Sequence, residues 1–249
     1  MAFAMLKSKH WIMYGVLAFA LALQVALWVY ARDIQARWAN VPPVPSALGA
    51  AGMGLGDTQF AYRSLGIMIQ NLGDTGGRTT HFNDYDYKAL AGWFDVMDRL
   101  DPKSDFIPFL AGYYFGAVEI PEKAAFMSDY LARQGMRPED QKWRWLARAS
   151  FIARFGEKNP DKALALAKQL AALHPKVDLP FWARQMPVFI LEDRGQKEAA
   201  LAMILETLKS EQATLPRAEI YAMVDVVCTR LLDKAEAKTF PLCVEYEEQ

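Results

Sequence analysis

Two patterns of apolar and polar positions divide this chain. From Trp11 to Ala31 the residues are apolar and uncharged, with Gln24 as the one polar side chain. Farther along, apolar residues recur every three or four positions, as between Tyr87 and Leu100, which is the period of a helix with one buried face. No long stretch alternates apolar and polar residues as a half-buried strand does. The pattern therefore predicts one wholly apolar helix followed by an all-α domain.

The apolar segment has the length of a membrane-spanning helix. At 1.5 Å per residue it extends about 30 Å, the thickness of the hydrocarbon layer, and a helix satisfies its own backbone groups in lipid. Aromatic residues stand at both ends, where such side chains settle at the headgroup layers: Trp11, Tyr14, Trp28 and Tyr30. The apolar region of a cleaved signal is shorter, roughly 7–15 residues. We therefore expect a retained transmembrane anchor.

Basic residues flank both ends of this segment about equally, so charge does not set its orientation. The short tail before it favours a cytoplasmic N-terminus in an inner membrane, with the following domain exported to a periplasm-like compartment. Cys228 and Cys243 are the only cysteines, and Pro241 can turn the chain between them. In an oxidising compartment they could form a disulfide, which would agree with export of the domain. The alternative is that they are two separate buried thiols, which would say nothing about the compartment.

Small residues form a stripe along the apolar segment. Gly15, Ala18, Ala22 and Ala26 recur at spacings of three and four, so they share one helix face. Such faces allow helices to approach closely in lipid. We expect this stripe to pack against the helix of another membrane protein.

Composition narrows the possible partners of the domain. The formal net charge is −1, which gives no general affinity for nucleic acid. With 53% hydrophobic and 12% aromatic residues, the chain is too apolar to remain disordered. We expect four parts: a tail (1–10), the anchor (11–31), a Pro/Gly-rich linker with a loop-like second half (32–55), and a helical domain (56–249).

A short phrase containing alanine recurs through that domain. Its alanines are spaced by 35, 39, 36 and 36 residues and stand at Ala89, Ala124, Ala163, Ala199 and Ala235. Gly116, Gly156 and Gly195 precede three of the phrases, where a left-handed glycine can end a helix. A fixed period of this size is typical of stacked helical hairpins whose alanines permit close packing.

These features resemble the tetratricopeptide (TPR) repeat family. Trp143-x-x-Leu146-Ala147 is similar to the family's Trp-x-x-Leu-Gly phrase, and Ile107-x-x-Leu110-Ala111-x-x-Tyr114 is a variant. A third copy carries Pro187, which should kink its helix. The resemblance covers roughly residues 85–235 and implies an α-solenoid that binds other proteins. It does not identify the partner, because one fold serves many functions.

Familiar catalytic and metal-binding motifs are absent. The sequence has no HExxH, CxxC, GxSxG or phosphate-binding loop, and its three histidines have no metal-ligand spacing. We therefore expect a protein that is not an enzyme and needs no metal or cofactor.

One loop nevertheless concentrates polar groups. Its candidates for a site are Asp74, Arg78, His81, Asp84 and Asp86. The oxygens could hold a hard cation and the glycines an anion, although the spacing is not that of an EF-hand. The loop could also contact a partner, or simply end one helix at Gly73 and cap the next with Asn83 or Asp84.

Three arginines form the second candidate site. Arg144 and Arg148 share one helix face, and Arg184 holds the like position one repeat later. In the family that the chain resembles, these helices line the concave groove, so the guanidiniums would suit a carboxylate-bearing segment. The alternative is that they lie solvated over neighbouring aromatic rings.

The sequence thus predicts a membrane-anchored interaction scaffold or accessory subunit of an envelope complex, whose partners are protein subunits and the lipid bilayer. The alternative function is a ligand- or ion-binding, or enzymatic, domain that uses the Asp74–Asp86 loop.

Overall fold

The structure is a computed structural model that describes residues 2–32, 40–75, 78–139, 141–211, 213 and 215–247. It divides into two compact units, residues 1–39 and 40–249. Apart from one pair of two-residue strands, the described residues form helices and the turns between them. The all-α prediction is therefore confirmed.

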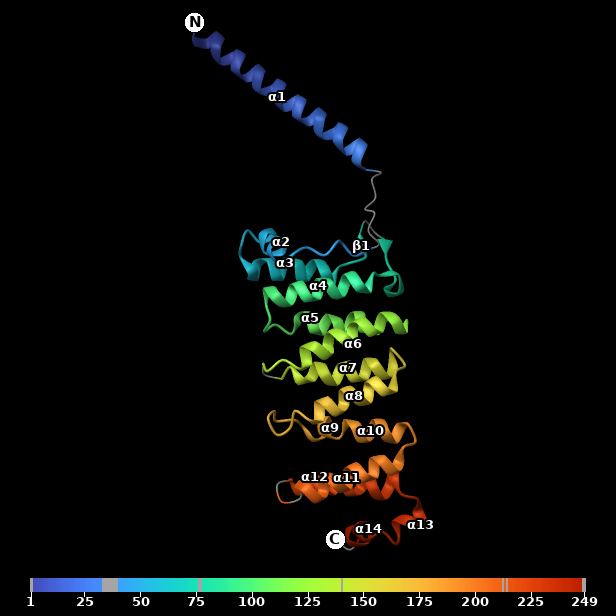
Figure 1. The fold of residues 1–249 in the computed structure, drawn as a ribbon. Coiled ribbons are helices and arrows are strands. Elements are labelled where there is room, and N and C mark those ends of the chain that lie inside the picture. The colour runs from blue at the N-terminus through green and yellow to red at the C-terminus, as the bar shows by residue number, and fades with distance from the viewer. Residues whose placement is uncertain are drawn as a thin grey trace. The chain divides into compact units, whose positions relative to one another are not determined.

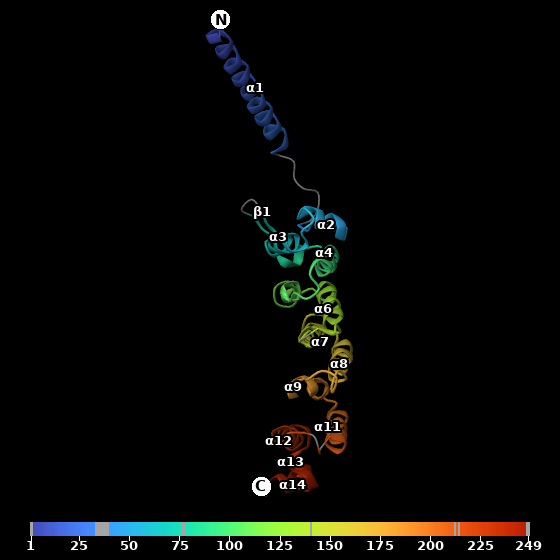
Figure 2. The same cartoon turned by 90° about the vertical axis from the view of Figure 1, so that its left-hand side faces the viewer.

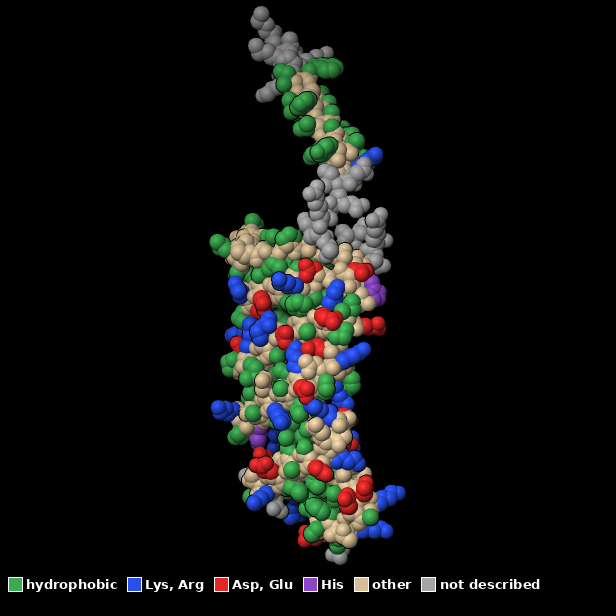
Figure 3. Space-filling model, turned by 45° about the vertical axis from the view of Figure 1, so that its right-hand side comes forward, with side chains coloured by type: hydrophobic (Ala, Val, Ile, Leu, Met, Phe, Trp, Pro, Cys, Tyr) green, Lys and Arg blue, Asp and Glu red, His purple; other side chains and the backbone are tan. Residues whose placement is uncertain are grey.

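The first unit contains a single long helix, α1 (Ala2–Ala31). Within it Trp11–Ala31 is long and apolar enough to cross a membrane, and none of that segment is buried in protein (Figure 1). Apolar side chains cover this helix in Figure 3. An N-terminal signal sequence has the same properties, so the helix is either an anchor or a signal.

The second unit begins earlier than the sequence predicts. Helix α2 (Ala47–Met53) lies in the segment expected to be a linker, and Ser46 caps it by accepting a hydrogen bond from Gly49 N at 3.0 Å. The proline-rich stretch before it also packs on the unit, because Val41 is buried and Trp93 Nε1 donates to Pro42 O at 2.8 Å. A helix rich in alanine and glycine has no apolar periodicity, which is why the sequence did not reveal it.

The elements follow one another in space as they do in sequence (Figures 1 and 2). α3 packs on α4, α4 on α6, α6 on α7, α7 on α8, α8 on α10 and α10 on α11. Their bounds are α3 Thr58–Gln70, β1 Asp74–Thr75, β2 Arg78–Thr79, η1 Phe82–Asp84, α4 Tyr87–Leu100, α6 Pro121–Gly135, α7 Trp143–Phe155 and α8 Pro160–Ala171. The remaining elements are α5 Phe106–Phe109, η2 Leu110–Tyr114, η3 Phe115–Ala117, α9 Phe181–Arg184, α10 Met186–Asp193, α11 Lys197–Glu211, α12 Arg217–Val226, η4 Val227–Leu231, α13 Lys234–Ala237 and α14 Pro241–Glu247.

Two hydrophobic clusters form the core of this unit. The first runs from Val41 to Ile190, and the second from Val188 to Cys243, so they meet at α10. The helix expected around Pro187 is interrupted at Gln185, with the proline in the first turn of α10. This agrees with the predicted kink, since proline removes a backbone donor and clashes with the preceding turn.

The phrase alanines do not occupy equivalent positions. Ala124 and Ala163 are the fourth residues of α6 and α8 and are fully buried, whereas Ala199 and Ala235 are exposed and Ala89 is partly buried. In α11 the buried fourth residue is Ala200, and in α4 it is Leu90. In α4 and α11 the buried residue therefore follows the phrase alanine by one position. The position counted from the helix start, and not the position in the phrase, determines which residue faces the core.

The glycine prediction also needs correction. Only Gly195 of the three has a positive φ, of 73°. At Gly116 a Cβ atom would lie 2.7 Å from Ala111 O, and at Gly156 it would lie 3.1 Å from Ala124 Cβ. These two positions therefore exclude larger residues through close packing and not through backbone conformation.

Candidate functional site

The three arginines predicted to line a groove have different surroundings. Arg184 forms ion pairs with Glu211, at 3.5 Å, and with Glu219. Arg144 pairs with Asp105 at 3.1 Å, and its guanidinium lies 5.9 Å from the centre of the Trp145 ring. Arg148 forms no ion pair with any described carboxylate. Of the three, it alone has no ion pair with an acidic side chain among the residues that the structure describes.

Arg148 is held between two aromatic rings. Its Cζ atom lies 4.4 Å from the Tyr113 ring centre and 4.7 Å from that of Phe151, and its Nε donates to Gly112 O at 2.9 Å. A Cβ atom at residue 112 would lie 3.1 Å from Arg148 Cγ, so glycine leaves room for the arginine. Partial burial lowers the pKa of Arg148, because removing the guanidinium from water disfavours its charged form. A negative group placed beside Arg148 would offset part of the free-energy cost of keeping the charged guanidinium partly out of water.

Exposed aromatic side chains surround this arginine. We call Phe109, Tyr113, Arg148, Phe151 and Phe155 the aromatic face; its four rings are between 47% and 56% exposed. They form two pairs four residues apart on the helix surface, with ring centres 5.3 Å apart in the first pair and 4.6 Å in the second. These rings are not among the candidates that the sequence suggested, although their i, i+4 spacing beside buried positions was a usable signal.

Hollows lie on both sides of the two phenylalanines of α7. The larger is an open groove of about 530 Å³, lined by Gly116, Ala117, Val118, Glu119, Arg148, Phe151, Ile152, Phe155, Gly156 and Lys158. The smaller, of about 120 Å³, is lined by Ser150, Phe151, Arg154, Phe155, Met186, Phe189 and Ile190. The groove thus combines apolar walls with two basic side chains and one acidic side chain, a lining that suits a short protein segment with a carboxylate.

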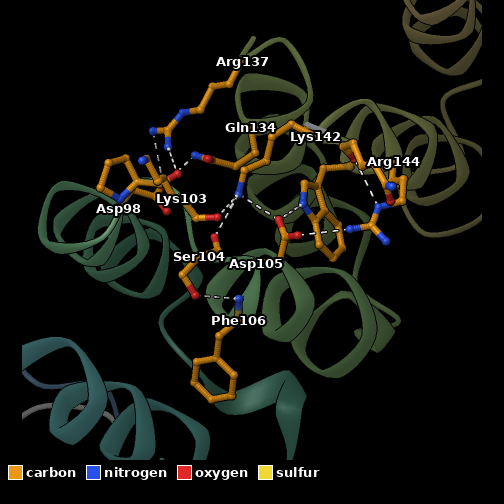
Figure 4. A network of polar contacts seen from close by, with 12 residues as sticks. Asp98, Lys103, Ser104, Asp105, Phe106, Gln134, Arg137, Lys142 and Arg144 are labelled. Atoms are coloured by element: carbon orange, nitrogen blue, oxygen red, sulfur yellow. Dashed lines mark hydrogen bonds and ion pairs between the residues drawn. The ribbon is translucent and has the colours of Figure 1, made fainter. Parts of the chain in front are cut away.

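A polar cluster rigidifies the helices that carry this face (Figure 4). Lys142 is only 2% exposed, and its ammonium donates to Lys103 O at 3.0 Å, Ser104 O at 3.0 Å and Asp105 Oδ1 at 2.8 Å. Trp145 Nε1 donates to the same carboxylate oxygen at 2.8 Å. Burial alone would raise the pKa of Asp105, but these hydrogen bonds and the charges of Lys142 and Arg144 lower it below its ordinary value. The cluster links the turn before α5 to the start of α7.

Asp98 is a buried carboxylate in the same region, whereas Asp105 is partly exposed (Figure 4). Tyr130 donates to its Oδ1 at 2.9 Å, Gln134 donates to its Oδ2, and Arg137 lies 3.7 Å away. Burial raises the pKa of Asp98 to about 6, although the Tyr130 hydrogen bond and the Arg137 charge act in the opposite direction. This aspartate does not reach the aromatic face, and its contacts are those of a structural core group.

The polar loop uses its described groups for local structure. Asp86 caps α4 by accepting from Ala89 N at 3.0 Å, and His81 Nδ1 accepts from Asn83 N at 3.1 Å. Asp84 is exposed. The side chains of Asp74 and Arg78 lie outside the described residues, although their backbones belong to β1 and β2. The cap of α4 is therefore Asp86, and not Asn83 or Asp84 as the sequence led us to expect.

Lys123 fixes this loop from the next helix. Its ammonium donates to Asn83 O at 2.6 Å and to Tyr85 O at 2.9 Å. The lysine of the recurring phrase thus holds the backbone of the loop against α6. Among the described residues, no three His, Cys, Asp or Glu side chains are grouped so that they could hold a metal ion.

The remaining sequence candidates are the two cysteines and the stripe of small residues in α1. Cys228 and Cys243 form a disulfide, with Cα atoms 5.7 Å apart. This bond ties α14 to η4 and hints at an extracytoplasmic location. In α1 the stripe of Gly15, Ala18, Ala22 and Ala26 is solvent-exposed, so its expected helix partner stays a prediction.

Comparison with known proteins assigns no family to this helical chain. Neither the family models, nor the curated proteins, nor the solved structures gave a match. The fold class and the candidate site therefore rest on the chain's own residues alone.

Proposed function

We propose that this protein is a single-pass, membrane-anchored scaffold or accessory subunit that binds another protein through the aromatic face of a TPR-like α-solenoid. Its partner presents a segment with an apolar side chain and a carboxylate. The observation that carries the proposal is Arg148, which lies uncompensated between Tyr113 and Phe151 beside an open groove.

Three features of residues 40–249 support the solenoid. Each long helix packs against its near neighbours in sequence, and a small buried residue occurs at the fourth position of α6, α8 and α11. The glycine at 156 brings α7 close to Ala124 of α6. Repeats that contact only their neighbours leave an extended surface, which is how solenoids bind partners.

The anchor and the disulfide support a location at the outer side of a membrane. Trp11–Ala31 exceeds the apolar length of a typical cleaved signal and has aromatic residues at both ends. A disulfide between the only two cysteines is expected where thiols are oxidised. The α1 stripe would provide a second contact with a membrane subunit.

Aromatic rings and arginine are the residues that dominate binding energy at protein interfaces. On the aromatic face the rings provide apolar area with little loss of side-chain entropy, and the desolvated guanidinium provides orientation through bidentate hydrogen bonds. Because Arg148 already forms its Nε hydrogen bond to Gly112, its position is fixed before a partner arrives. Such preorganisation lowers the entropy cost of association.

Site-specific photocrosslinking of the full chain in its native membranes tests this function. A photoreactive residue at Phe155 should capture one protein at a stoichiometric level, and Phe151→Ser or Arg148→Gln should abolish that product. The same photoreactive residue at Phe126, which is exposed on α6 outside the aromatic face, is the matched control. If both positions capture the same proteins, or if purification in mild detergent yields the chain alone, the scaffold proposal is wrong.

A further inference from the structure

The N-terminal end of residues 40–249 differs from the rest of the unit's surface. Between Arg37 and Asp57 the sequence contains no charged residue. Figure 3 shows apolar and neutral side chains at the end of this unit that carries α2, whereas acidic and basic side chains are scattered over the helices that follow. A surface without charges cannot provide the ion pairs that usually orient a soluble partner.

Three apolar side chains project from this end. Leu48 is 85% exposed, Met53 61% and Leu55 95%. We call these three residues the apolar tip. Leu48 lies in α2, Met53 is the last residue of that helix, and Leu55 lies in the turn that follows it. None of the three belongs to either hydrophobic cluster of the unit.

The apolar tip is presented by a rigid support. Ala50 on the opposite side of α2 is fully buried, and α2 packs against α3 and α4. A Cβ atom at Gly54 would lie 2.5 Å from Asp57 O, so the turn after α2 fits closely on the start of α3. The exposure of the tip is thus a consequence of how α2 is docked.

Leu55 has a backbone conformation that leucine rarely adopts. Its φ is 54°, in the left-handed region where asparagine or glycine is favoured. Neither packing nor backbone preference within the protein therefore accounts for a leucine at this almost fully exposed position.

The length of the connecting segment limits the distance between the apolar span of α1 and α2. The apolar span ends at Ala31, and Val41 is already buried against the unit. The ten residue steps from Ala31 to Val41 span at most about 35 Å when fully extended. If α1 is anchored in a bilayer, α2 therefore stays within reach of the headgroup layer of that bilayer.

We propose that the apolar tip inserts into the boundary between headgroups and acyl chains of the membrane in which α1 is anchored. This inference rests on the retention of α1 given in the proposed function. Apolar side chains on a short helix bind this boundary by burying their area in lipid. Because the tip has no basic residue, insertion needs no anionic lipid, in contrast to surface helices that depend on lysine and arginine.

Fluorescence of the full chain reconstituted in phosphatidylcholine vesicles tests the insertion. Met53→Cys carries an environment-sensitive NBD label while Leu48 and Leu55 stay intact, and no reductant is used, so the bonded native cysteines do not react. The label at 53 should show blue-shifted emission, quenching by lipids with a quencher on the upper acyl chain, and protection from aqueous iodide. Met136→Cys, an exposed methionine on another part of the unit, is the matched control and should show none of these.

A second variant keeps the test independent of the label. Replacing Leu48 and Leu55 by asparagine, which the left-handed backbone at 55 accepts, should eliminate quenching at position 53. Adding anionic phosphatidylglycerol should leave quenching of the parent chain unchanged. Equal access of iodide to positions 53 and 136 would overturn the insertion.

Membrane retention is measured separately, by flotation after carbonate extraction. If the chain floats but the label at 53 stays exposed to water, only the tip proposal fails. If the chain does not float, the anchor fails and the tip proposal fails with it.

Discussion

At the scale of single residues, two carboxylates of the helical unit have pKa values shifted in opposite directions. Asp98, which is buried near the end of α4, is destabilised in its ionised form by burial, whereas the half-exposed Asp105 before α5 is stabilised in that form by Lys142, Trp145 and Arg144. The two carboxylates therefore respond differently to pH, although Figure 4 shows them in one network of polar contacts.

Asp98 makes the protein more stable as the solution is acidified from neutral pH. Its pKa of about 6 in the folded chain exceeds the ordinary value of 3.8, so the folded state binds the proton more tightly. The resulting stabilisation is complete below about pH 4 and is lost as the pH rises through about 6. Compared with Asp98→Asn, the wild type should gain on the order of 2–3 kcal/mol in unfolding free energy between about pH 7 and about pH 4. Urea denaturation at both pH values measures this difference, and parallel pH profiles would contradict the assignment.

Lys142 should be among the least replaceable charged residues. Lys142→Met removes the ammonium that donates to two backbone carbonyls and to Asp105, while Trp145 and Arg144 still donate to that carboxylate, so unfolding free energy should fall by about 2 kcal/mol. Lys168→Met, on an exposed part of α8, is the matched control and should change it by less than about 0.5 kcal/mol. Denaturant titration of both variants compares them directly.

At the scale of elements, the sequence predicted helices and their approximate spacing better than the side that each helix buries. The phrase marked the starts of α6 and α8, but in α11 the core-facing alanine is Ala200 and not Ala199. A one-residue difference in the helix start rotates all side chains by about 100°. Sequence periodicity alone does not define the start, because capping contacts such as that of Asp86 depend on the folded turn.

Leucine substitutions test which alanines of α8 and α11 face the core. Ala163→Leu and Ala200→Leu insert atoms where α8 and α11 are closely packed, and each should destabilise the protein by about 1–3 kcal/mol. Ala199→Leu is the matched control, since residue 199 is exposed and the change should be within about 0.5 kcal/mol. Thermal unfolding ranks the three; equal effects at 199 and 200 would mean that α11 is rotated.

The polar loop can be tested as a capping element. Asp86→Ala removes the acceptor for Ala89 N and should lower unfolding free energy by about 1 kcal/mol, whereas Asp84→Ala should have little effect. Calorimetric titration of the parent chain with calcium should give no binding heat. Binding that disappears in these variants would instead favour the ligand-site alternative.

At the scale of the whole molecule, the disulfide and the apolar helix place related constraints on location. The bond closes a loop between residues separated by 15 positions, which corresponds to about 3 kcal/mol in the chain-entropy description. It joins α14 to the second hydrophobic cluster, to which Cys243 belongs. We therefore expect reduction to loosen the C-terminal helices before the first cluster opens.

Denaturant titration with and without reductant tests the contribution of the disulfide. Reductant should lower the unfolding free energy of the wild type by about 3 kcal/mol and should leave that of the double variant Cys228→Ser, Cys243→Ser unchanged. In intact cells, a membrane-impermeant thiol reagent should label the wild type only after reduction. Labelling without reductant, or only after the cells are opened, would contradict an exported, oxidised domain.

What the sequence by itself determined is the division between an apolar segment of membrane-spanning length and a helical domain, because both follow from the local spacing of apolar residues. The paired cysteines could be named from the sequence, but their bond required two helices to meet. Only the tertiary structure decided that Arg144 and Arg184 form ion pairs while Arg148 meets no described carboxylate, since the partners Asp105 and Glu219 lie far from these arginines in sequence. It also decided that α2 exists and that Leu48 in this helix and Leu55 in the following turn are exposed. These properties depend on which surfaces pack together, and residues distant in sequence determine that.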